Sequence, residues 1–258
     1  MTSLLERQRT HFNSIAGRYR SARLGANHRA LKSLMWSDFL RDKVELKRPG
    51  LSVLDAMCGY ADAYAIVREH LSSDFDYSGF DYSDEVVALV RHENPGLRIE
   101  HADVTRFSPA RTYDLVIVLG GLHHIRHAAA DTVKRLAGAI RPGGWFLSLE
   151  PTHGNRLFGA LRKAIYRRNP LFDAATEQDF AVGELMAMFE AAGLDLVDVM
   201  YPGLLSYVLY YNPDAFPQLN VGSTRTVRFR FSIERPLMRS VVGRVLSFAT
   251  LSLWRRPA

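Results

Sequence analysis

The chain has 258 residues, of which 47% are hydrophobic and 23% charged, which is enough for one sizeable globular domain. Its single cysteine, Cys58, excludes an internal disulfide and favours a reducing compartment. No apolar run reaches the roughly 18 residues of a membrane span, and the N-terminus has no apolar signal segment, so we expect a cytoplasmic protein.

The net charge of +6 is distributed unevenly. Residues 1–50 carry 11 basic and 4 acidic residues, residues 51–150 carry 9 and 14, and residues 151–258 carry 13 and 9. A nucleic-acid-binding protein usually has one dense basic stripe, and this chain has none. The basic flanks are equally typical of an anionic substrate or surface as partner and of a chain in which arginine is simply common.

Residues 1–46 are predicted to form a helical lid. Apolar residues recur at helical spacing in two stretches, Phe12, Ile15, Ala16 and Tyr19, then Leu31, Leu34, Met35 and Leu40.

From residue 47 to residue 258, short β-type runs alternate with helical stretches, which indicates an α/β domain. We expect seven strands, mostly parallel, with helices on both faces, and the last strand at an edge of the sheet. The strands are expected at 51–56, 77–82, 97–102, 113–120, 145–150, 194–200 and 247–254. The helices are expected near 61–70, 84–92 with Ser83 as N-cap, 129–140 ending at the turn 141–144, and 176–192 with Thr176 as N-cap.

Two segments interrupt this alternation, at about 151–175 after the fifth strand and 201–244 after the sixth. Ligands of open α/β sheets bind beyond the carboxyl ends of the strands. We therefore expect these insertions and the N-terminal helices to form a cap over a ligand site.

The most informative stretch is VLDAMCGYADAY, from Val53 to Tyr64. A strand runs into Asp55, then into a tight turn with Gly59, then into a helix. Glycine lets the backbone approach a ligand closely. The stretch lacks the three glycines of a dinucleotide fingerprint, and the chain has neither a phosphate-binding G-x-x-x-x-G-K-[ST] loop nor a Tyr-x-x-x-Lys pair.

This stretch resembles the first motif, V-L-D-x-G-x-G-x-G, of the class I S-adenosylmethionine-dependent methyltransferases, in particular those that act on natural products and quinones. Met57 and Ala61 stand where that family usually has glycine, so Met57 must either keep a negative φ or accept backbone strain. The resemblance implies a Rossmann-like fold and S-adenosyl-L-methionine as cofactor. It extends through YDLVIVLGGLHHI (113–125) and IRPGGWFLSLEP (140–151) over about residues 50–200.

The resemblance also implies roles for single residues. Asp81 would accept hydrogen bonds from the ribose hydroxyls, and Asp103 would meet the adenine amino group beside the backbone of Val104. The cofactor-binding residues it implies are Tyr19, Asp55, Ala56, Gly59, Asp81, Tyr82, Asp103, Val104, Leu119 and Gly120. Taken singly, Asp55 is also compatible with a helix cap, and Asp81 and Asp103 with turns, but the three in register favour the cofactor roles.

A protonated nucleophile needs a base, and two histidines follow the fourth strand. We expect His123 to be that base, oriented by Glu150, with His124 as second candidate and His153 as third. We expect no metal site at His123, His124 and His127, because adjacent histidines point apart and no carboxylate or cysteine has ligand spacing nearby.

The segment 201–216 is rich in aromatic residues, which favours a substrate pocket, the core of the cap or a homodimer seam. The segment 155–168 predicts a basic amphipathic helix that meets an anionic group on the acceptor, a membrane surface or solvent. Its pattern sets Arg156, Arg162, Lys163, Arg167 and Arg168 around Leu157, Phe158, Leu161 and Ile165.

We therefore expect methyl transfer, most simply to oxygen, onto a small apolar acceptor. In one alternative the acceptor also carries an anionic group. One alternative is a methyltransferase-like binding module without turnover, which the replacement of motif glycines by Met57 and Ala61 favours. The other is a methyltransferase acting on RNA or lipid. DNA is not expected as a partner, because the fourth motif lacks the Pro-Pro of base-amino enzymes and Cys58 lies in the cofactor turn.

Overall fold

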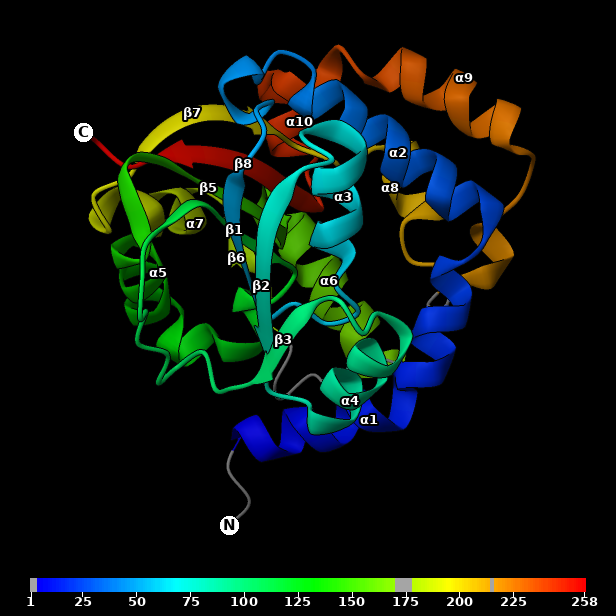
Figure 1. The fold of residues 1–258 in the computed structure, drawn as a ribbon. Coiled ribbons are helices and arrows are strands. Elements are labelled where there is room, and N and C mark those ends of the chain that lie inside the picture. The colour runs from blue at the N-terminus through cyan, green and yellow to red at the C-terminus, as the bar shows by residue number, and fades with distance from the viewer. Residues whose placement is uncertain (1–3, 170–177, 214–215) are drawn as a thin grey trace.

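The computed structural model describes residues 4–169, 178–213 and 216–258 and shows an α/β fold (Figure 1). Seven strands form the sheet in the order β3-β2-β1-β4-β5-β8-β7, and the short β6 pairs with β5 outside this path. Their bounds are β1 Leu51–Ala56, β2 Phe75–Asp81, β3 Arg98–His101, β4 Tyr113–Leu119, β5 Ile140–His153, β6 Phe180–Ala181, β7 Asp195–Met200 and β8 Ala249–Arg255. Strands β1 to β5 are mutually parallel, and β8 is antiparallel to both its neighbours.

The helices confirm the predicted alternation. Their bounds are α1 Leu4–Arg23, α2 Ala26–Leu40, α3 Asp62–His70, α4 Asp84–Glu93, α5 Ala129–Gly138, α6 Arg156–Arg168, α7 Val182–Ala191, α8 Leu205–Tyr210, α9 Thr224–Glu234 and α10 Val241–Val245. Short 3-10 turns lie at η1 Val44–Leu46, η2 Leu122–Ala128, η3 Pro217–Leu219 and η4 Leu237–Arg239. Ser83 caps α4 as expected, because its hydroxyl accepts a hydrogen bond from the Val86 N–H at 3.2 Å.

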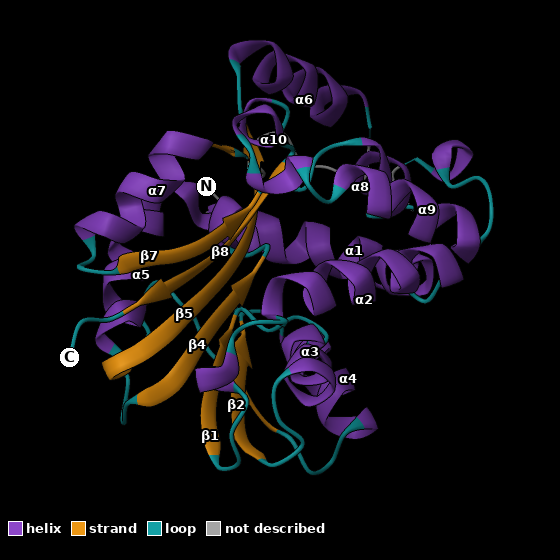
Figure 2. Cartoon of the chain, turned by 90° about the horizontal axis from the view of Figure 1, so that it is seen from above, coloured by secondary structure: helices purple, strands orange, loops and turns teal. Residues whose placement is uncertain are grey.

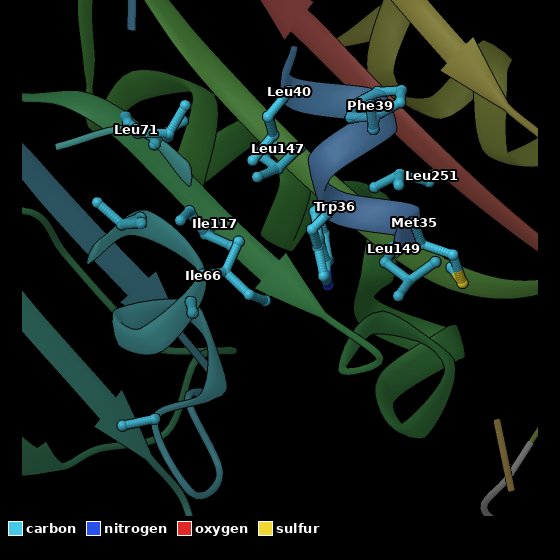
Figure 3. Close-up of a cluster of buried hydrophobic side chains, with 14 of the residues drawn as sticks. Met35, Trp36, Phe39, Leu40, Ile66, Leu71, Ile117, Leu147, Leu149 and Leu251 are labelled. Atoms are coloured by element: carbon cyan, nitrogen blue, oxygen red, sulfur yellow. The ribbon is translucent and has the colours of Figure 1, made fainter. Parts of the chain in front are cut away.

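Helices cover both faces of the sheet, with α5 and α7 on one side and α2, α3 and α4 on the other (Figure 2). Helix α2 belongs to the core of the domain, because Met35, Trp36 and Phe39 are almost completely buried. Figure 3 shows these side chains packed against Leu147 and Leu251 of the central strands. The predicted division at residue 46 therefore falls in a chain segment that shares one core with the sheet.

Two insertions stand at the end of the sheet, as predicted. Helix α6 follows β5, and helices α8, α9 and α10 lie between β7 and β8 (Figure 2). The two insertions contact each other, because the Asn155 side-chain amide donates to the Val245 carbonyl at 2.7 Å.

Three details differ from the prediction. Strand β8 lies between β5 and β7 and not at an edge, because both of its sides pair with antiparallel neighbours. Residues 141–144 begin β5 and do not form a separate turn, and α5 already ends at Gly138. Thr176 lies outside the described residues, and α7 begins at Val182.

No helix within the described ranges combines the length and apolar character that crossing a membrane requires.

Candidate active site

A cavity of about 430 Å³ lies beyond the carboxyl ends of β1, β2, β4 and β5. The order of the sheet reverses between β1 and β4, and such a switch point is where open α/β sheets bind ligands. Side chains from α2, α6 and α8 line the side of the cavity that faces away from the sheet. The fold thus places the predicted cap over the predicted site.

The turn after β1 has an unusual backbone. Met57 and Ala61 both have positive φ angles, 57° and 59°, as does Gly59 at 50°. Of the two alternatives that the sequence left open at Met57, the structure shows the strained one, because a side chain in this region crowds its own backbone. A Cβ atom built on Gly59 meets nothing within 4 Å, so the turn borders open space there.

Met57 is accommodated by a glycine on the neighbouring loop. A Cβ atom on Gly121 would lie 2.7 Å from the Met57 sulfur and 3.0 Å from its Cβ. The side chain that replaces a motif glycine therefore occupies room that another glycine leaves. This compensation joins positions 64 residues apart, and no local pattern announces it.

Asp55 is almost completely buried and accepts a hydrogen bond from the Tyr77 hydroxyl at 2.6 Å. Burial raises the pKa of Asp55 to about 8, against the opposing effect of that hydrogen bond. Asp55 thus lines the cavity while being tied to the strand beside it.

Asp81 ends β2 with both carboxylate oxygens engaged. One oxygen accepts the Gly59 N–H at 2.9 Å and the other accepts the Ser83 N–H at 2.9 Å. Burial raises the pKa of Asp81, while these backbone donors oppose the rise. Each carboxylate oxygen has a further lone pair, so the pair of oxygens retains the capacity to accept from two adjacent hydroxyls.

Asp103 also lines the cavity, and its Oδ1 accepts from the Thr105 N–H at 2.8 Å and the Thr105 hydroxyl at 2.7 Å. Its Oδ2 lies 3.8 Å from Arg106 Nε. Asp103 is therefore a turn residue whose second oxygen borders the cavity. Among the other residues implied by the resemblance, Tyr82, Val104, Leu119 and Gly120 line the same cavity.

For two of the implied residues, the structure gives no contact with the cavity. Ala56 is fully buried within β1 and is not part of the cavity lining. The side chain of Tyr19 lies outside what the structure describes, although its backbone belongs to α1.

Glu150 and His123 form one buried cluster. Oε1 of Glu150 accepts the N–H groups of Gly121 and Leu122, both at 2.9 Å, and Oε2 lies 3.1 Å from His123 Nδ1 and accepts the His123 N–H at 3.3 Å. Burial raises the pKa of Glu150 to about 8 and lowers that of His123 to about 3, so the imidazole is held neutral. The ring of His124 lies against that of His123, with centres 3.8 Å apart, and both histidines line the cavity.

His153, the third candidate base, is not part of the cavity lining. Its Nδ1 is 2.8 Å from Oδ2 of Asp179, and that carboxylate also lies 3.2 Å from Nε of Arg162. Arg162 is only 7% exposed and lines the cavity, so of the alternatives left open for this helix, the membrane surface and solvent do not apply to this arginine. Its guanidinium points inward because a buried carboxylate and the Thr152 carbonyl receive it.

The cap supplies aromatic side chains from the segment predicted to do so. Tyr207 and Tyr211 stack with ring centres 4.4 Å apart, and both line the cavity with Phe216. Tyr210 and Tyr201 are buried elsewhere in the core, so the aromatic segment serves the cavity and the core together.

Sequence reasoning missed the contribution of α2. His28, Lys32 and Trp36 recur every four residues and all line the cavity. The spacing was a usable signal, because residues four apart share one face of a helix, but these polar positions are interleaved with the apolar positions of the core.

Within the described ranges, no three His, Cys, Asp or Glu side chains are grouped so as to hold a metal ion.

The donor set fits S-adenosylmethionine. The acidic edge suits hydroxyl groups and a cationic ligand, and the open side of Gly59 admits close approach. The indole N–H of Trp36 is buried and has no hydrogen-bond partner among the described residues. Strand order and the cavity at the switch point are those of a class I methyltransferase fold.

Comparison with known proteins agrees with this class. Residues 53–144 match the family described as "Methyltransferase domain". The demethylmenaquinone methyltransferase of Bacillus cytotoxicus is 23% identical over 59% of this chain and 73% of its own length.

Solved structures share the fold over most of the chain. A methyltransferase solved in complex with the Haloferax volcanii Trm112 methyltransferase activator has a TM-score of 0.65 and 17% identity, over 97% of each chain. The [4+2]-cyclase SpnF has a TM-score of 0.59 and 15% identity, over 87% of this chain and 80% of its own. Residues 53–144 thus form a methyltransferase domain, which implies S-adenosyl-L-methionine as cofactor, and the chain shares its fold with solved methyltransferases.

Proposed function

We propose that this methyltransferase transfers the methyl group to a hydroxyl oxygen of a small, flat, apolar acceptor, with His123 as the base. The observation that carries the proposal is that one cavity is lined by the acidic edge, by His123 and by the stacked Tyr207 and Tyr211. The demethylmenaquinone methyltransferases among the relatives support an acceptor of quinol type.

The aromatic part of the cavity suits a planar acceptor, because tyrosine rings offer apolar area and a polar tip. Support for an anionic acceptor is weaker. Four cationic side chains line the cavity: Arg9, Arg23, Lys32 and Arg162. Arg9 is paired with Glu6 and Asp84, Lys32 with Asp62 and Arg162 with Asp179, so three of these charges are already balanced.

When bound, the cofactor supplies a methyl group on a sulfonium cation, from which a neutral thioether is a good leaving group. The protein then has to orient the acceptor and remove its proton. A neutral His123 has the lone pair that this step requires. Glu150 is a positioning residue, because it sets the tautomer through Nδ1 and stabilises the imidazolium that forms.

This pair predicts the pH dependence of turnover. Protonation of Glu150 removes the negative charge that supports His123, and the pKa of Glu150 is raised to about 8. We expect kcat to rise with pH between about 7 and 9 and then to level off. Single-turnover rates at saturating cofactor measure this profile, and Glu150→Gln should flatten it while leaving cofactor affinity within a factor of about two.

His123→Ala should lower kcat by about 10²-fold or more at unchanged cofactor affinity. His124→Ala is the matched control and should cost far less. Full turnover by the His123→Ala enzyme would contradict the base role, and a flat wild-type profile would contradict the role of Glu150.

The acceptor is identified by incubating the enzyme with cofactor labelled in the methyl group and a panel of quinols, phenols and fatty acids. Label in an alkali-stable ether of a quinol or phenol supports the proposal. Label attached to carbon would contradict O-methylation while leaving the acceptor class intact, and label in fatty acids alone would contradict both.

We also propose that the outer face of α9 and α10 rests on an anionic membrane surface, where apolar acceptors are concentrated. Phe229 and Ile233 lie one turn apart on α9, and with Leu237 of η4 and Val241 of α10 they are 41% to 78% exposed; we call these four side chains the apolar stripe. Arg225 and Arg228 flank this apolar stripe and are exposed, which complements a negatively charged surface.

A further inference from the structure

The face of α2 that borders the cavity carries three polar side chains that the methyl-transfer chemistry does not use: His28, Lys32 and Trp36. The three side chains differ in their hydrogen-bonding partners. His28 is 3% exposed, with Nδ1 3.3 Å from the Tyr210 carbonyl. Lys32 is paired with Asp62, and Trp36 has a buried indole N–H without a partner in the described structure.

The Trp36 nitrogen is the unusual one. The residue is 1% exposed and packs in the core, yet it belongs to the cavity wall together with Leu119 and Gly120. In Figure 3 the nitrogen-bearing end of its ring points toward the carboxyl end of the strand that carries Ile117, which is β4. A buried N–H donor is rarely left unpaired, so its natural partner is a ligand oxygen in this cavity.

The Lys32–Asp62 pair stands beside it. Nζ and Oδ2 are 2.6 Å apart, and the side chains are 19% and 54% exposed. Asp62 is the first residue of α3 and follows the strained turn at Ala61. The pair therefore joins α2 to the cofactor turn.

A lysine, an aspartate and an indole donor match one chemical group, the α-amino acid. Its carboxylate accepts from a lysine and an N–H donor, and its ammonium donates to a carboxylate. The cofactor carries such a group at the end opposite its adenine. The acidic residues assigned to the nucleoside, Asp81 and Asp103, lie on β2 and after β3, so α2 faces the part of the turn they leave open.

We propose that α2 binds the amino-acid end of the cofactor, with Lys32 and the Trp36 N–H holding its carboxylate and Asp62 holding its ammonium. The zwitterion enters between Lys32 and Asp62, so that one internal ion pair is exchanged for two to the ligand. In the free protein the same pair keeps both charges balanced.

The test compares two ligands by calorimetry, S-adenosylhomocysteine and 5′-methylthioadenosine, which lacks the amino-acid end. Trp36→Phe and Lys32→Met should each weaken S-adenosylhomocysteine binding about tenfold and leave methylthioadenosine binding within about twofold. Lys43→Met is the matched control, because Lys43 forms a similar 2.7 Å pair with Asp198 outside the cavity.

Equal loss of both ligands in the Lys32→Met protein would overturn the proposal, because it would show a structural role for the lysine. No loss of either ligand would overturn it as well. If Trp36→Phe does not fold, the selective effect of Lys32→Met decides the question. Methylthioadenosine binding by the wild-type protein reports separately that the nucleoside part of the cofactor site is intact.

Discussion

At the scale of single residues, the cofactor turn shows how a departure from a motif is accommodated. Met57 and Ala61 hold left-handed backbone that glycine would hold without strain, at about 1–2 kcal/mol each. The fold keeps this turn because its flanks are fixed, by the Cys58 N–H donating to the Phe80 carbonyl and the Ala61 N–H donating to the Cys58 carbonyl. The strain is therefore local and is carried by the surrounding sheet.

The contact between Met57 and Gly121 makes a double-mutant prediction. Gly121→Ala should lower the free energy of unfolding by about 1–3 kcal/mol, because the new methyl group meets the Met57 side chain. In a Met57→Gly background the same change should cost at least about 1 kcal/mol less. Chemical denaturation of the four proteins measures the coupling, and strictly additive effects would disprove the contact.

His28 makes a prediction about acid stability. Burial, then the charges of Arg23 and Lys32, lower its pKa to about 4. The unfolded chain therefore binds a proton below pH 6.5 that the folded chain refuses until about pH 4, so stability falls as the pH falls through this window, by up to about 3 kcal/mol.

His28→Asn should remove most of this loss while retaining a donor near the Tyr210 carbonyl. Unfolding free energies at pH 7 and pH 5 measure the difference between wild type and variant. His92→Gln, at an exposed position, is the control and should follow the wild type. An identical pH dependence of wild type and His28→Asn would show that His28 is protonated in the folded protein.

At the scale of elements, α6 is held by charge as well as by apolar contact. The Arg162 guanidinium lies 5.3 Å from the Phe248 ring centre and 3.2 Å from Asp179, which also holds His153. The side of α6 that faces the cavity therefore carries no net charge at Arg162, because Asp179 balances it. Its outer face keeps the remaining basic residues that the amphipathic pattern predicted.

Asp179→Asn should destabilise the protein by about 3–5 kcal/mol, because it leaves a buried guanidinium without its carboxylate. Adding Arg162→Met should recover much of the loss, since an apolar side chain then replaces the charge. Glu184→Gln breaks an exposed pair with Arg126 and should cost under about 1 kcal/mol. Thermal unfolding measures all three, and a small effect of Asp179→Asn would mean that water solvates Arg162.

At the scale of the whole molecule, the exposed stripe of α9 and α10 predicts membrane association. The protein should co-sediment with vesicles containing anionic lipid and much less with neutral vesicles, and added salt should release it. Phe229→Ser with Ile233→Ser should reduce binding several-fold. Leu196→Ser with Val197→Ser, on exposed positions of β7, is the control and should not. Dimerisation through the stripe, seen as a concentration-dependent mass, would contradict the membrane interpretation.

Much of the molecule followed from local patterns. The alternation of strands and helices, the capping of α4 by Ser83 and the positions of Asp55, Asp81 and Asp103 at strand ends were all readable, because they depend on burial period and turn chemistry within a few residues. Parallel topology then brings those strand ends to one edge, so the acidic side of the site was predictable as well.

Other features depend on residues far apart in the chain, which a local pattern does not encode. The position of β8 between β5 and β7, the room that Gly121 leaves for Met57, and the pairing of Arg162 with Asp179 are contacts that exist only once the chain is packed. The amino-acid sequence alone therefore determined the class of fold and the acidic edge of the cavity, through short-range periodicity. The tertiary structure alone decided which polar side chains of α2 and α6 turn inward, because burial of a charge depends on whether a distant partner is there to neutralise it.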